Sequence, residues 1–260
     1  MSAGTFTPSP GAAPVSRMIL AQTALETRML LRNGEQLLLT VIIPALLLTL
    51  FSAVDIVTVP TGEGGAGKSV DFLAPGILAL AVMSTAFTGQ AIATGFDRRY
   101  GVLKRLGASP LPRWALMAAK TLSVLVTEVL QIALLTAIAF ALGWSPHGNP
   151  LSAAVLILLG TAASSGLGLL MAGTLKAEAT LAAANLVFLL LLVGGGVIVP
   201  MEKFPGAVQS VLGLLPISAL SDGLREVLQH GAALPWGDAA ILAGWAVLGL
   251  GAAARWFRWE

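Results

Sequence analysis

The chain has 260 residues, of which 56% are hydrophobic and 11% are charged, with no cysteine and a formal net charge of +2. Soluble domains carry about 25% charged residues, so this chain has too few polar side chains to cover a water-soluble globule of its size. The composition excludes a soluble enzyme, a disordered chain and a disulfide-stapled secreted domain. A mean hydropathy of +0.86 indicates a polytopic membrane protein instead, and so small a net charge does not point to nucleic acid.

The N-terminal region divides into a tail and an amphipathic segment. Residues 1–14 are uncharged and include three prolines, which predicts a disordered tail. One transmembrane domain is expected to occupy residues 15–260. Between Val15 and Gln36, the side chains of Met18, Leu25 and Met29 fall on one helical face. This pattern predicts a helix lying at the cytoplasmic membrane surface, with an ordinary basic flank as the alternative.

Six apolar segments are long enough to cross a bilayer as helices. They are expected at about residues 37–54, 72–95, 115–143, 151–174, 180–199 and 239–254. The predicted fold is therefore all-α and polytopic, with six transmembrane helices. Trp114 and Trp144 bracket the third span, which suggests that both indole rings lie at headgroup level.

The basic residues predict the orientation of these spans. An even number of crossings puts both termini on one side, together with the loops after the second and fourth spans. Twelve of the 15 lysines and arginines fall on that side and three on the other. Cytoplasmic loops are enriched in basic residues, so both termini are expected to be cytoplasmic.

Residues Gly62–Ser69, GEGGAGKS, match the phosphate-loop pattern in which backbone amides hold a nucleotide. Such a loop requires a buried strand before it and a helix starting at Lys68. Here the preceding segment is the end of an apolar span, Pro75 follows within seven residues, and the loop is expected outside the cell. We therefore interpret the match as a glycine-rich loop that resembles the motif by chance.

The loop Phe96–Arg113, FDRRYGVLKRLGASPLPR, contains five of the 15 basic residues. Val102, Leu103 and Leu106 line one side of a short predicted helix, and basic residues flank it. A short basic helix between two spans is suited to docking into a groove on a cytoplasmic partner. The alternative is a positive anchor with no partner.

A second irregular segment, residues 200–237, precedes the last span and is too polar and proline-rich to cross the membrane. Its apolar residues repeat at helical spacing on both sides of Pro216. This predicts two half-helices that re-enter the outer leaflet, tolerated where protein covers them. Asp222 and Arg225 are spaced for an i,i+3 contact. An ordinary outer loop is the alternative.

One carboxylate, Glu128, falls near the middle of the third span, and Gln131 follows one turn later. A charge at mid-bilayer costs about 2.5–3.5 kcal/mol, so Glu128 should face the protein interior or a water-filled cavity. The pair either lines a substrate path or forms structural hydrogen bonds. A proton-coupled secondary transporter that uses Glu128 is the alternative function.

The stretches FDRRYGVLKRLGASPLPRWALMAAK and PISALSDGLREVLQHG, together with the order of the spans, resemble one known family. The chain is similar to the ABC-2 type transporter permeases, in particular the bacterial drug-efflux branch typified by the daunorubicin-resistance membrane protein. That family usually has a glutamate where this loop offers Asp97 and Arg98.

The resemblance implies a half-transporter of the bacterial plasma membrane that exports a drug-like, lipid or other amphipathic substrate. It is not expected to be an enzyme or to bind a cofactor or metal itself. ATP and Mg²⁺ would be bound by a separate cytoplasmic ATPase subunit. The other expected partners are a second permease, either an identical copy or a paralogue, and membrane lipids, but no nucleic acid.

The resemblance also assigns residues. The outer re-entrant segment would include Pro216, Asp222 and Arg225. The loop that couples to the ATPase would comprise Asp97, Arg98, Arg99, Tyr100, Gly101, Leu103, Lys104, Arg105, Leu106, Ser109 and Pro110.

Overall fold

The computed structural model describes residues 11, 13–34, 38–53, 69–197 and 205–258. In these ranges all regular structure is helical, as the sequence predicted. The helices, of which η1 and η2 are π-helical, are α1 (Val15–Arg32), η1 (Leu38–Ile42), α3 (Ile43–Ala53), α4 (Ser69–Met83), η2 (Ser84–Gly89), α5 (Gln90–Arg99), α6 (Val102–Gly107), α7 (Arg113–Ala141), α8 (Pro150–Thr174), α9 (Ala177–Gly194), α10 (Gly206–Leu212), α11 (Pro216–Leu228) and α12 (Trp236–Trp256).

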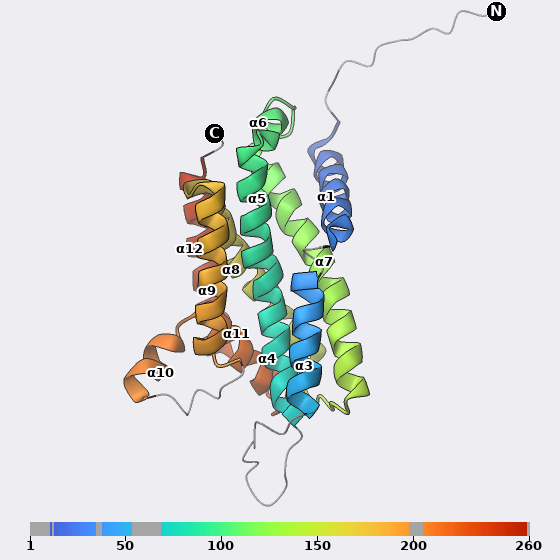
Figure 1. Ribbon diagram of the computed structural model, residues 1–260, viewed down its shortest axis with the longest axis vertical. Helices are drawn as coiled ribbons and strands as arrows, with labels where there is room; N and C mark the ends of the chain where they lie inside the picture. Colours follow the sequence, from blue (N-terminus) through green and yellow to red (C-terminus); the bar gives the residue numbers. More distant parts are fainter. Residues whose placement is uncertain (1–10, 12, 35–37, 54–68, 198–204, 259–260) are drawn as a thin grey trace, which may run out of the picture.

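The long helices run side by side along the long axis of the molecule (Figure 1). α6 lies at one end of this bundle, close to the start of α1 and the last turn of α12. α10 and α11 lie at the opposite end. We call these the α6 end and the α11 end. The described residues nearest the two termini therefore lie at the same end, as an even number of crossings requires.

Five helices are long and apolar enough to cross a membrane: 69–99, 114–141, 150–174, 177–194 and 236–256. They correspond to the second through sixth predicted spans, with boundaries shifted by a few residues. The first predicted span, 37–54, is represented by a shorter apolar helix, Thr40–Ser52. The prediction of six crossings is thus confirmed for five, and the first described helix is shorter than expected.

The second span forms the centre of the bundle, and 94% of its apolar window is buried. It consists of α4, η2 and α5 in one continuous rod, with Pro75 inside α4. The predicted second span, 72–95, already included this proline, and the observed helix begins before it, at Ser69. Proline removes one backbone donor, but packing on all sides holds the helix in place. Of the GEGGAGKS residues only Ser69 is described, and it begins α4; the rest lie outside the described residues.

The apolar core surrounds this central rod. Leu73, Ile77 and Leu80 on α4 are fully buried, and α11 contributes Leu220 and Leu224. The ring of Trp144, three residues after the end of α7, is also buried in this core. Trp114 at the other end of α7 is exposed.

Helix α8 packs most closely against α12, and glycine makes this approach feasible. A Cβ on Gly166 would lie 2.5 Å from the backbone nitrogen of Leu250 in α12. A Cβ on Gly168 would lie 2.8 Å from the carbonyl of Phe87 in η2. The small residues of the fourth span are therefore used for packing within the chain.

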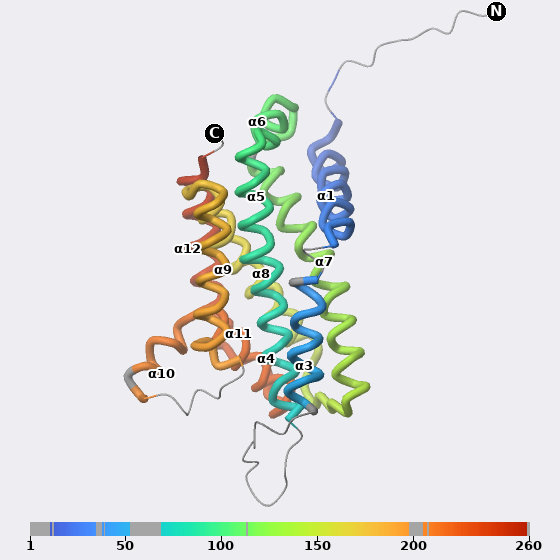
Figure 2. The backbone as a smooth tube through the Cα atoms, viewed as in Figure 1, coloured from blue at the N-terminus to red at the C-terminus, as the bar shows by residue number. Residues whose placement is uncertain are grey.

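The predicted N-terminal helix, 15–36, is present as α1 and ends at Arg32; residues 35–37 and most of the predicted tail lie outside the described residues. Figure 2 shows α1 alongside the first part of α7, at the α6 end. Thr23 is buried in this contact and donates to the Ala119 carbonyl at 3.4 Å.

Candidate functional site: the α5–α6 hairpin and its anchors

The α5–α6 hairpin protrudes at the α6 end of the bundle (Figure 1). Gly101 joins the two helices in a left-handed conformation, with φ of +69°, which glycine adopts without a Cβ penalty. On α6, Leu103 faces inward and is 1% exposed, whereas Lys104 and Arg105 are exposed. The predicted short basic helix is present, and it presents its charged side outward.

The end of α6 is closed by its own polar groups. Ser109 Oγ donates to the Leu106 carbonyl at 2.5 Å, and the Leu111 backbone N–H donates to Ser109 Oγ at 3.4 Å. Ser109 and Pro110 are exposed and Leu106 is half-buried. The serine therefore stops the helix, and the following proline leads the chain toward α7.

Two arginines at the base of the hairpin connect it to the α8–α9 corner. Arg98 donates to the carbonyls of Gly173, at 2.7 Å, and Leu175. Arg99 pairs with Glu178 in the first turn of α9 and lies 5.9 Å from the centroid of the exposed Tyr100 ring. These contacts fix the base of the hairpin to α8 and α9.

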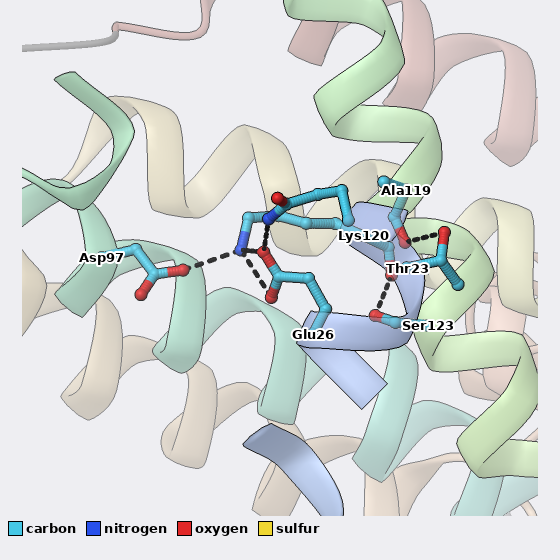
Figure 3. A network of polar contacts seen from close by, with 7 residues as sticks. Thr23, Glu26, Asp97, Ala119, Lys120 and Ser123 are labelled. Carbon is cyan, nitrogen blue, oxygen red and sulfur yellow. Dashed lines mark hydrogen bonds and ion pairs between the residues drawn. The ribbon is translucent and has the colours of Figure 1, made fainter. Parts of the chain in front are cut away.

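Asp97, another residue of the predicted coupling loop, belongs to a buried ion triad (Figure 3). Lys120 on α7 lies between Glu26 on α1 and Asp97 on α5. Its Nζ is 2.7 Å from Asp97 Oδ2 and 3.0 and 3.1 Å from the two carboxylate oxygens of Glu26. The lysine is 4% exposed. One ammonium group thus joins three helices.

Glu26 and Lys120 were not identified as site residues from the sequence. Lys120 was counted only as a basic residue of the cytoplasmic flank, and Glu26 as part of the polar face of a surface helix. The available signal was a lysine that begins an apolar run of more than 20 residues, since a buried lysine needs an acidic partner.

A second polar network lies farther inside the bundle. Thr85 Oγ1 donates to Gln131 Oε1 at 2.8 Å, and Gln131 Nε2 donates to the Thr40 carbonyl. Glu128 is 1% exposed, and its Oε2 lies 2.6 Å from the Thr161 hydroxyl. Both predicted residues therefore face the protein interior, and each is hydrogen-bonded to a neighbouring helix.

Only a small cavity separates the two networks. It holds about 20 Å³, which is room for about one water molecule. Its walls include Gln90, Thr94 and Lys120, but neither Glu128 nor Gln131. Among the described residues no cluster of three histidine, aspartate or glutamate side chains is placed to hold a metal.

The two predicted half-helices are present at the α11 end as α10 and α11, and Pro216 is the first residue of α11. Arg225 is buried and pairs with Asp222 at 3.0 Å, the contact that the i,i+3 spacing predicted. Its guanidinium also donates to the carbonyls of Gly196 and Val197 at 2.7 and 2.9 Å. These carbonyls belong to the irregular segment after α9, so Arg225 pairs buried backbone acceptors that no helix satisfies.

Arg225 also reaches the first turn of α4. It lies 4.0 Å from the centroid of the Phe72 ring, a cation–π distance. A Cβ on Gly76 would lie 2.8 Å from its Nη2, so glycine provides the space for the arginine. The sequence predicted the partner Asp222 but not these contacts with α4 and α9.

Comparison with known proteins agrees with this arrangement. The sequence model of the ABC-2 type transporter family matches residues 19–228. The linearmycin resistance permease protein LnrN of Bacillus subtilis (strain 168) is 30% identical over 174 residues, which are 65% of this chain and 44% of that protein. This chain thus spans less than half the length of that relative.

A second relative is similar over almost its whole length. YvfS of the same strain, which carries the name of a transport permease, is 26% identical over 230 residues, or 87% of this chain and 91% of that protein. The family match covers the hairpin, the triad and α11. The chain is a member of the ABC-2 type transporter family of integral membrane permeases.

Proposed function

We propose that this chain is the membrane subunit of an ATP-driven exporter in the bacterial plasma membrane, with both termini and the α5–α6 hairpin in the cytoplasm. A separate ATPase subunit, which binds ATP and Mg²⁺, docks on the hairpin. A second permease, identical or paralogous, completes the translocation path. The apolar helix formed by η1 and α3 also crosses the membrane, so that with the five longer helices the chain crosses six times.

The observation that carries this proposal is how the hairpin is held. Lys104 and Arg105 are exposed at its tip, while Asp97 and Arg98 at its base are tied to the other helices of the bundle. A force applied to the tip is therefore transmitted to α1, α7 and the α8–α9 corner. An anchor that only fixed topology would need the charges but not these buried connections.

Export requires that nucleotide binding shift the permease between an inward-facing and an outward-facing arrangement. The nucleotide must therefore bind these two arrangements of the transporter with different affinity. The substrate that we propose is drug-like, lipid or otherwise amphipathic. The relative named for linearmycin resistance supports a drug-like substrate. Pro216, Asp222 and Arg225 would close the path from the outside.

The test is charge reversal at the tip of the hairpin. Lys104→Glu and Arg105→Glu, made singly, are compared with Arg255→Glu, an exposed arginine at the same end on α12. Each chain is purified with its ATPase from its own host and assayed in vesicles for ATP-dependent transport. We expect the hairpin variants to lose bound ATPase and transport while Arg255→Glu retains both. Full ATPase binding and transport in both hairpin variants would overturn the proposal.

A further inference from the structure

A groove lies along α1 and is bordered by Val126 of α7. It has a volume of about 500 Å³ and is open to the surroundings. It combines apolar side chains with two arginines. The groove residues are Leu20, Thr23, Ala24, Thr27, Arg28, Leu31, Arg32 and Val126.

Among the described residues, the basic side chains of this groove have no acidic counterpart. Arg28 and Arg32 are four residues apart on α1, so their side chains are neighbours on one helical face. Both are exposed, and within the described ranges neither forms an ion pair. The nearest acid on the helix, Glu26, is already bound to Lys120. Two adjacent guanidinium groups with no counterion among the described residues favour an anionic ligand, above all a phosphate.

The remaining walls require that this ligand also be apolar. Leu20, Leu31 and Val126 are exposed by 65%, 39% and 44%. Val126 lies 13 residues after the start of α7 at Arg113, a distance of about 20 Å along the helix. Val126 belongs to the predicted third span, so this wall of the groove is expected to face lipid.

The position of α1 sets the arginines at the right level. The contacts of Thr23 with Ala119 and of Glu26 with Lys120 place the middle of α1 beside the first turns of the span. Arg28 and Arg32 follow within two turns and share the groove with Val126. Long arginine side chains near the end of a span reach back to the phosphate level, and basic pockets between helices on the cytoplasmic side hold anionic headgroups. The groove therefore matches a lipid in both charge and depth.

We infer that the α1–α7 groove binds an anionic phospholipid. The phosphate lies between the guanidinium groups of Arg28 and Arg32, and an acyl chain lies against Leu31 and Val126. The lipid is a bound structural partner that fixes α1 against α7, next to the triad. The inference depends on the membrane insertion of this family and not on the identity of the exported substrate.

The experiment measures lipid binding to the full chain by native mass spectrometry, with phosphatidylglycerol, phosphatidylcholine or soluble glycerol 3-phosphate as the probe. Arg28→Gln/Arg32→Gln is compared with Arg17→Gln/Arg255→Gln, which removes two exposed arginines outside the groove. We expect phosphatidylglycerol to bind the wild type and the control, and to bind the groove variant about tenfold more weakly. Val126→Trp, which narrows the groove without changing its charge, should weaken binding in the same way if the arginine variant misfolds.

Several results would overturn the inference. Equal binding of phosphatidylcholine, or an equal loss in the groove and control variants, would mean that the groove does not select the lipid. Binding of glycerol 3-phosphate as tight as that of the lipid would show a free phosphate site without an acyl chain. Unchanged lipid binding together with loss of the ATPase from the arginine variant would assign the groove to the ATPase.

Discussion

Replacing Lys120 with methionine tests the buried triad most directly. The acceptor oxygens of Asp97 and Glu26 lie 2.7 and 3.0 Å from the same nitrogen, so without the ammonium two carboxylates face each other within about 6 Å. At an effective dielectric constant of about 20, their repulsion is roughly 3 kcal/mol. This agrees with the range of about 3–5 kcal/mol for removing one partner of a buried ion pair.

The assay is thermal unfolding of the purified chain in detergent. For a chain of this size, roughly 3 kcal/mol corresponds to a fall in Tm of about 6–12 °C. Lys104→Met, which removes an exposed lysine, is the control and should change Tm little. The triple variant Lys120→Met/Glu26→Gln/Asp97→Asn removes all three charges and should recover most of the loss. A Tm for Lys120→Met equal to that of the control, or a triple variant as unstable as the single one, would refute the electrostatic reasoning.

The triple variant also separates stability from transport. If the triad only holds the fold, the neutral version should transport as well as the wild type once it is stable. We expect instead that ATP-dependent transport falls while ATP hydrolysis by the complex continues, because α5 is no longer tied to α1 and α7. Normal transport would restrict the triad to a structural role.

Three further predictions concern other parts of the bundle. Arg225→Lys keeps the charge but loses the fork that bonds the carbonyls after α9, and should lower the free energy of unfolding by about 2 kcal/mol, measured by thermal melting. Gly166→Ala should destabilise the chain by about 1–3 kcal/mol, because its Cβ would meet the backbone of α12, whereas Gly244→Ala, with no atom within 4 Å of its Cβ, should not. Glu128→Gln should retain ATP-dependent transport in vesicles, since glutamine still accepts a hydrogen bond from Thr161; complete loss of transport with a normal fold would favour the proton-coupled alternative.

The sequence predicted the helices well because lipid imposes a simple rule. An apolar run long enough to cross the bilayer must be a helix, so five spans were located within a few residues. Pro75 lies within one of these spans, and packing on all sides lets the helix tolerate it. The end of an apolar run located Trp144 after the third span, but it did not predict that the ring would be buried against the core.

The contacts that join the helices were less predictable. Asp222 and Arg225 were paired correctly because they lie three residues apart on one helix. Lys120 is separated from Asp97 by 23 residues and from Glu26 by 94, so their meeting depends on the packing of three helices. From a single sequence one can predict that a buried lysine needs an acidic partner, but not which acidic residue it is.

The side of α1 that packs against α7 was also not predictable from the sequence, and the reason is physical. Leu25 and Met29, which the periodicity placed on the membrane-binding side, are about half exposed, whereas Thr23 and Glu26 contact α7. In water the apolar side of a helix packs inward, but lipid removes that driving force and leaves polar groups to seek protein partners. The side of α1 that bears Glu26 therefore belongs to the protein, and its apolar residues and Arg28 remain available to the bilayer. A helix arranged in this way stays attached to α7 through Thr23 and Glu26 while its other side remains in contact with lipid.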